Sequence, residues 1–186
     1  MIVGFWWLGI ALISLELTTA WDISPLEAGI AGSLVSAGML LGSVLFGGIS
    51  DLYGRIFAYK ICAVVYIVFT IIMMCSVNMI MIYIAAFAVG AGYGGDVTNT
   101  ASILTDSLPL SKRWVLTFLT IFWAVGATII IILGLILNAL SVESILIFRF
   151  LMGFILVCCI MALIMRMFMD ETAKQLFSVG KHDEAV

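Results

Sequence analysis

Long apolar stretches separated by short polar breaks run through the whole chain. Each stretch holds about 20 residues or more, the length that an α-helix needs to cross about 30 Å of hydrocarbon. The breaks and the segment after the last stretch together carry most of the charged residues, and both prolines, Pro25 and Pro109, lie in breaks. The pattern predicts six transmembrane helices, at about residues 2–20, 28–49, 56–77, 79–104, 114–137 and 144–169, followed by a charged tail at 170–186.

The composition agrees with a membrane protein. The chain is 65% hydrophobic and 10% charged, with a mean hydropathy of +1.29, whereas a soluble domain is about half apolar and about a quarter charged. These values exclude the soluble and disordered classes, and no basic patch indicates binding to nucleic acid. We therefore expect an all-α, polytopic membrane helix bundle whose surroundings are the lipid bilayer.

The basic residues cluster on one side of the predicted bundle. Cytoplasmic loops carry an excess of Lys and Arg, and here the second break, the fourth break and the end of the sixth stretch hold nearly all of them. Only Arg149 lies elsewhere. We therefore expect a multi-pass plasma-membrane protein with both termini in the cytoplasm. The clustered basic residues are Arg55, Lys60, Lys112, Arg113, Arg166, Lys174 and Lys181.

The sequence gives little support for a bound cofactor or for enzyme activity. The four cysteines lie inside apolar stretches and lack the spacing of a metal or redox site. The single histidine, His182, is in the tail, which excludes a membrane Ser–His dyad. No ATP-binding loop motif is present, so any transport would draw on an ion gradient. We expect no metal, no cofactor and no enzyme activity.

The second break has the sequence Gly47-Gly-Ile-Ser-Asp51-Leu-Tyr-Gly54-Arg55. Glycine suits a tight turn, whereas an Asp at the C-terminal end of a helix needs a donor or cation. This segment resembles the Gly-x-Leu-x-Asp-x-x-Gly-Arg loop of the major facilitator superfamily, with Ile49 in place of Leu. The resemblance implies a cytoplasmic gating network, although ordinary loop charges are an equally good interpretation of any one residue. The expected gating residues are Gly47, Asp51, Gly54, Arg55, Asp106 and Arg113.

Two later segments are similar to the sugar and metabolite:proton symporter branches of that superfamily. They are the glycine-rich run 90–96 and the loop 106–113, and residues 171–181 resemble the Glu-Ser-Pro-Arg segment after helix six. Ala86 replaces an Arg that often opens the glycine-rich motif, and the fifth stretch lacks the Gly-Pro pair of drug:proton antiporters.

The resemblance implies the N-terminal six-helix half of a secondary transporter, with residues 170–186 as a cytoplasmic tail at the start of the central linker. Such a transporter works by alternating access and binds its substrate between two six-helix halves. We expect proton-coupled symport of a small metabolite, a sugar or an organic or inorganic anion, with a C-terminal six-helix half as partner. The alternative is a truncated or split membrane subunit that binds another chain without transporting.

Asp96 is one of three ionisable residues that we place within the membrane, where charges are costly and functional by default. On a helical wheel it shares a face with Tyr93, Asn99 and Thr100, while Gly90 and Gly94 lie on the opposite face. The polar face suits a water-filled cavity, and we expect its four residues to couple protons to substrate. The alternative is an Asp that hydrogen-bonds at a packed interface.

Glu16 and Arg149 are the other two. Each lies six residues from an external break, or about 9 Å below the surface. Opposite charges at one depth offset each other's burial, so an ion pair is favoured over substrate binding.

Small residues predict where helices pack together in lipid. The second stretch has Ala28, Gly32 and Ser36 at a spacing of four, followed by Gly38 and Gly42. Gly90 and Gly94 supply a matching face on the fourth.

Overall fold

The computed structural model describes residues 24–109, 112, 114–140 and 143–168 of the 186-residue chain. Within these ranges the structure is all-helical. The predicted helix at 2–20 and the tail at 170–186 lie outside the described residues, so the expected count of six helices is not tested. The helices are α2 (Pro25–Tyr53), α3 (Arg55–Met74), α4 (Met79–Ser107), α5 (Trp114–Ala139) and α6 (Ser144–Met167).

Four helices, α2, α3, α4 and α6, are long and apolar enough to cross a membrane. In α5 the apolar stretch found among the described residues is shorter, Ala124–Ala139. The described elements thus agree with a multi-pass bundle of membrane helices.

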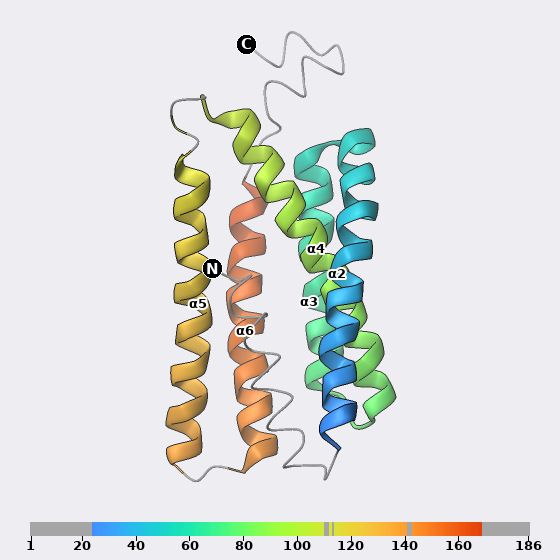
Figure 1. The fold of residues 1–186 in the computed structure, drawn as a ribbon, viewed down its shortest axis with the longest axis vertical. Helices are drawn as coiled ribbons and strands as arrows, with labels where there is room; N and C mark the ends of the chain where they lie inside the picture. The colour runs from blue at the N-terminus through green and yellow to red at the C-terminus, as the bar shows by residue number, and fades with distance from the viewer. Residues whose placement is uncertain (1–23, 110–111, 113, 141–142, 169–186) are drawn as a thin grey trace.

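The helices run along the long axis of the molecule, and α4 crosses it obliquely (Figure 1). α4 packs against α2 and α3, while α6 packs against α3 and α5. Successive helices run in opposite directions, so α2, α4 and α6 end at the level where α3 and α5 begin. We call this level, uppermost in Figure 1, the Gly54 end after the residue that joins α2 to α3.

Local sequence explains why α2 begins where it does. The Ser24 side chain accepts a hydrogen bond from the backbone N–H of Glu27, and the Ser24 N–H donates to the Glu27 carboxylate at 3.1 Å. This reciprocal capping box satisfies two donors that a helix start leaves unpaired. Pro25 occupies the first turn, where its missing N–H costs nothing.

Glycines set the contact between α2 and α4. Added Cβ atoms at Gly38 and Gly42 of α2 would overlap backbone atoms of Phe87 and Ala91. Gly90 and Gly94 meet the α2 backbone in the same way, so these four glycines form the predicted packing faces. The rest of the predicted stripe differs: a Cβ at Gly32 would meet no described atom within 4 Å, and Ser36 is exposed.

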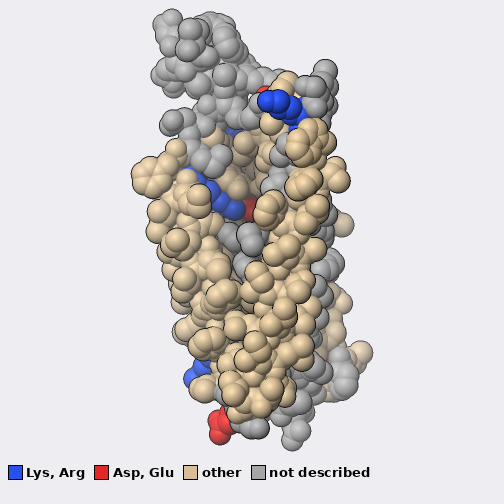
Figure 2. Space-filling model, turned by 90° about the vertical axis from the view of Figure 1, so that its left-hand side faces the viewer, with Lys and Arg blue, Asp and Glu red and all other residues tan. Residues whose placement is uncertain are grey.

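The apolar core lies mainly where α3, α4 and α6 meet. Tyr66, Ile82 and Leu151 are fully buried members of it, while many large apolar side chains point outward, as expected for contact with lipid. On the face drawn in Figure 2, charged side chains are few: they lie near the two ends and in the upper half, and the middle of the described surface carries none.

Candidate functional site

The centre of the candidate site is a buried ion pair between α4 and α6. Nη1 of Arg166 lies 2.6 Å from Oδ1 of Asp96, and only 6% and 4% of the two side chains are exposed. The sequence pattern indicates that Arg166 follows the sixth span as one of the basic residues on the cytoplasmic side. That assignment is wrong, because Arg166 lies in the last turn of α6 and turns inward.

Two tyrosines of α3 surround the guanidinium of Arg166. Its Cζ lies 3.7 Å from the centroid of the Tyr59 ring and 5.7 Å from that of Tyr66. Nη1 also donates a hydrogen bond of 3.3 Å to the Tyr59 backbone carbonyl. A cation over an aromatic face is attracted by the ring quadrupole, so Arg166 links α6 to α3 as well as to α4.

The glycine-rich run of α4 brings this site together. A Cβ at Gly95 would lie 2.6 Å from both Cys62 Sγ and Phe46 Cβ, and one at Gly92 would lie 3.2 Å from the Cys62 carbonyl oxygen. These two glycines therefore let α3 approach α4, while Gly90 and Gly94 do the same for α2. The glycine-rich run therefore permits close packing on two faces of α4, and Asp96 directly follows this run.

The other predicted residues of the Asp96 face are placed together, as expected from the helical wheel. Tyr93 and Asn99 are buried, with 4% and 1% exposed, and Thr100 is half-buried. Nδ2 of Asn99 lies 3.8 Å from Cys62 Sγ. In the described part of the chain this face is buried, and Cys62 of α3 and Arg166 of α6 contact it; the water-filled cavity stays a prediction.

Two polar atoms beside the ion pair lack hydrogen-bond partners among the described residues. They are the hydroxyl of Tyr66 and Oδ1 of Asn99, both buried. Buried polar atoms are nearly always paired with protein or water. The described interior between α3, α4 and α6 therefore holds neutral polar side chains as well as a charge pair.

A second ion pair lies at the Gly54 end. Arg55, the first residue of α3, pairs with Asp106 of α4 and donates a hydrogen bond of 2.9 Å to the Ser102 carbonyl. Gly54 has φ 115°, a region that residues with side chains rarely adopt. This conformation turns α2 directly into α3 and places Arg55 against α4.

The other described residues of the predicted gating set lie outside this ion pair. Asp51 is exposed in the last turn of α2, and Gly47 is half-buried with Thr98 as the nearest neighbour of an added Cβ. Arg113 lies outside the described residues. The structure thus brings Arg55 and Asp106 together and leaves Asp51 facing outward.

The predicted pair of Glu16 and Arg149 is not tested. Glu16 lies outside the described residues, and the Arg149 side chain is exposed near the start of α6.

Sequence reasoning missed Arg166, Tyr59 and Tyr66. One signal was available for Arg166, since it lies inside the predicted span 144–169 and therefore belonged with the intramembrane charges. Nothing in the sequence pattern distinguishes the two tyrosines from other aromatic residues of α3.

Ionisable residues inside a bundle of membrane helices are functional-site candidates by default. A model of the sugar (and other) transporter family matches residues 16–186. The chain therefore belongs to this family and to the major facilitator superfamily, which confirms the resemblance noted in the sequence. Members are transporters rather than enzymes, as the sequence predicts.

Curated relatives match at modest identity. The niacin transporter NiaP of Acinetobacter baylyi is 29% identical over 118 residues, which is 63% of this chain and 27% of NiaP. Human synaptic vesicle glycoprotein 2C is 28% identical over 186 residues, or 85% of this chain and 23% of that protein. The chain thus spans only about a quarter of the length of these relatives.

A solved structure shares the fold. The inward-open conformation of the xylose transporter XylE from E. coli matches with a TM-score of 0.76 at 16% sequence identity. The match covers 95% of this chain and 48% of XylE.

Proposed function

We propose that this chain is the N-terminal six-helix half of a proton-coupled transporter that moves a small metabolite, sugar or organic anion by alternating access. Family membership and the shared fold support transport. The observation that carries the proposal furthest is the buried Asp96–Arg166 pair. A carboxylate held inside the bundle against one cation has two states, charged and paired or protonated and unpaired, that differ in what they attract.

The proton would be taken up at Asp96. In its charged form the carboxylate pairs with Arg166, and in its neutral form it becomes a hydrogen-bond donor. Asn99, with a buried carbonyl oxygen that lacks a partner among the described residues, is a suitable acceptor in the same interior. Tyr93 and Thr100 belong to the same face of α4, and we propose all four as residues that couple protons to substrate.

The Gly54 end faces the cytoplasm in this proposal, as the excess of basic residues there supports. The protein then lies in the plasma membrane with both termini in the cytoplasm. The Arg55–Asp106 pair would hold α3 against α4 while the cytoplasmic side is closed. Asp51, exposed at the end of α2, and Arg113 would contact the second half of the transporter.

The proposed substrate class is based on the substrates for which similar proteins are named. One is named for niacin, another from Acinetobacter baylyi is a benzoate transport protein, and the solved structure is a xylose transporter. Niacin and benzoate are both aromatic carboxylates, which makes them the first anions to test beside a sugar.

Uptake into proteoliposomes tests the proposal. The tagged chain is purified with the partner that copurifies from its own membranes and is reconstituted with an inside-alkaline pH gradient. We expect labelled nicotinate, benzoate or xylose to accumulate, and a protonophore to abolish the accumulation. Asp96→Asn should remove the response to the gradient, whereas Glu143→Gln, an exposed carboxylate at the start of α6, serves as the matched control. Accumulation that is indifferent to the gradient and to Asp96→Asn would contradict proton coupling.

A non-transporting subunit is the second candidate, because the chain covers only 48% of XylE. Native mass spectrometry of the purified complex, combined with the uptake assay, separates the two proposals. A transporter half should copurify with a second helical bundle and support uptake, while the alternative predicts a complex that forms without uptake.

A further inference from the structure

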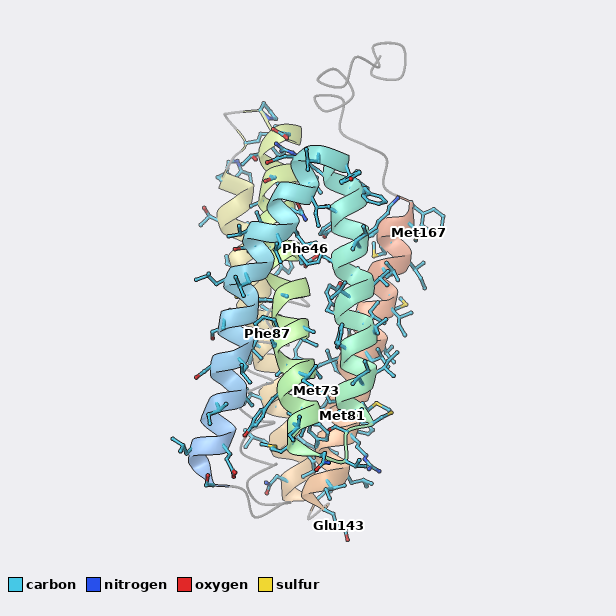
Figure 3. The ribbon with its side chains drawn as sticks, turned by 90° about the vertical axis from the view of Figure 1, so that its right-hand side faces the viewer. Phe46, Met73, Met81, Phe87, Glu143 and Met167 are labelled. Atoms are coloured by element: carbon cyan, nitrogen blue, oxygen red, sulfur yellow. The ribbon has the colours of Figure 1, made fainter. Side chains whose placement is uncertain are left out.

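Arg166 turns inward at the place where α6 is about to end. Met167 is the last residue of the helix, and Figure 3 shows it at the end of α6 opposite to Glu143. An Arg this close to a helix end normally extends along the apolar surface and reaches water. Here the side chain is 6% exposed, so its contacts with Asp96 and Tyr59 must hold it inside.

We propose that the charge of Asp96 holds the C-terminal end of α6 against α3 and α4, and that Arg166 is the positioning residue that converts protonation of Asp96 into movement of that end. This inference rests on the proposed function, because it names the part of the bundle that responds to the coupling proton. A proton bound to Asp96 would release the last turns of α6 toward the Gly54 end.

The physical reason is the cost of an unpaired charge. Arg stays protonated in proteins, so it cannot respond to a lost partner by becoming neutral. Removing one member of a buried ion pair is strongly destabilising because it leaves the other charge without compensation. The remaining contacts of Arg166, with the rings of Tyr59 and Tyr66, the Tyr59 hydroxyl and the Tyr59 backbone carbonyl, involve no opposite charge and are weaker than the lost pair. The guanidinium therefore gains by moving to water, which lies about one helical turn away.

Among the described residues around the ion pair, Asp96 is the group whose protonation can leave Arg166 unpaired. From α3, the titratable neighbours are Tyr59, Cys62 and Tyr66, from α4 Tyr93, and from α6 Cys159. Tyr and Cys side chains are neutral between about pH 5 and 7 in ordinary surroundings. Over that range only the Asp96 carboxylate, of these groups, changes between charged and neutral forms.

Hydrogen–deuterium exchange of the full chain in detergent tests the inference. The reporting peptide covers residues 161–168 at the end of α6, and the reference peptide covers residues 38–46 of α2, which contact the other face of α4. In Asp96→Asn at neutral pH, we expect the reporting peptide to exchange at least about tenfold faster than in the wild type. The reference peptide should not change. Wild-type protein should show the same change as the pH falls, after correction by an unstructured peptide.

A double variant distinguishes an unpaired charge from lost packing. In Asp96→Asn/Arg166→Gln neither charge remains, so the reporting peptide should be protected at every pH. Fast exchange in the double variant, or protection in Asp96→Asn equal to that of the wild type, would overturn the inference. If Asp96→Asn does not fold, the wild-type pH series decides alone, and a flat series rejects the inference.

The exchange experiment needs no substrate and no transport. A responsive α6 in a chain that supports no uptake would therefore reject the proposed function alone. Proton-driven uptake with an unresponsive α6 would reject only this inference.

Discussion

Gly42 of α2 and Ala91 of α4 are in direct backbone contact, and a Cβ atom on Gly42 would overlap the Ala91 carbonyl oxygen. We predict that Gly42→Ala destabilises the protein by about 1–3 kcal/mol, because backbone atoms of α4 cannot move aside as a flexible side chain would. Thermal unfolding of the chain in detergent, followed by size-exclusion chromatography, measures the loss.

Gly48→Ala is the matched control for this variant. It lies on the same helix, and an added Cβ would meet nothing within 4 Å among the described residues. Alanine also has the higher intrinsic helix propensity, so Gly48→Ala should be neutral or stabilising. Equal losses in the two variants would show that the α2–α4 contact is looser than described.

Gly54→Ala should destabilise the turn between α2 and α3. The residue has φ 115°, and its N–H donates to the Ser50 carbonyl while its carbonyl accepts from Ala58 N–H. A side chain at this backbone conformation costs about 1–3 kcal/mol. We expect a lower unfolding midpoint for Gly54→Ala than for Gly47→Ala, whose Cβ would make an ordinary contact of 3.9 Å with Thr98. A Gly54→Ala midpoint equal to that of Gly47→Ala would contradict the strained turn.

The sequence predicts where helices begin better than it predicts which helix contacts a given face, and the reason is physical. Apolar length and polar breaks determine where a chain can cross a membrane, so α3 and α6 begin within a residue of their predicted starts. A helical wheel shows which residues share a face but not which helix covers that face. For this reason the sequence places Asp96 and Asn99 on one face of α4, whereas their contacts with Arg166 of α6 and Cys62 of α3 cannot be predicted from it.

Arg166 shows a second limit of sequence reasoning. Its position near the end of a span indicates a basic residue that marks the cytoplasmic side, since Arg residues at span ends usually reach water. Its actual direction depends on Asp96, which is far away in sequence and becomes a neighbour only through packing. The Arg55–Asp106 pair was easier, because both residues belong to loop motifs expected on one side of the membrane.

Tyr59→Leu should weaken the hold on Arg166, because it removes the aromatic face 3.7 Å from the guanidinium. A cation–π contact of this kind contributes about 0.5–2 kcal/mol. The unfolding midpoint of Tyr59→Leu should fall, and its loss should shrink in an Arg166→Gln background. Tyr59→Phe keeps the ring but removes the hydroxyl that hydrogen-bonds Thr100 and Arg166, so its loss should be smaller than that of Tyr59→Leu. A loss for Tyr59→Leu that is unchanged without Arg166 would assign the effect to apolar packing.

Arg55 and Asp106 should show measurable coupling in a double-mutant cycle. Their side chains are 25% and 8% exposed, so the pair is only partly screened by water and salt. We expect a coupling free energy of about 1 kcal/mol from the unfolding of Arg55→Gln, Asp106→Asn and the double variant. Strictly additive losses would mean that the ion pair contributes nothing to stability and that Arg55 acts through its bond to Ser102.

Glu16 and Arg149 remain a predicted ion pair, and charge exchange tests it. Either charge alone within the outer part of the membrane is costly, so Glu16→Gln and Arg149→Gln should each lower the yield of folded protein. The exchange variant Glu16→Arg/Arg149→Glu restores opposite charges at the same depth and should recover part of that yield. Recovery of the yield requires that the two side chains contact each other. If each charge were solvated separately, the exchange variant would lose as much folded protein as the two single variants together. An exchange variant that recovers nothing would place the two charges apart, with Arg149 extended to the surface where its exposure already allows it to reach water.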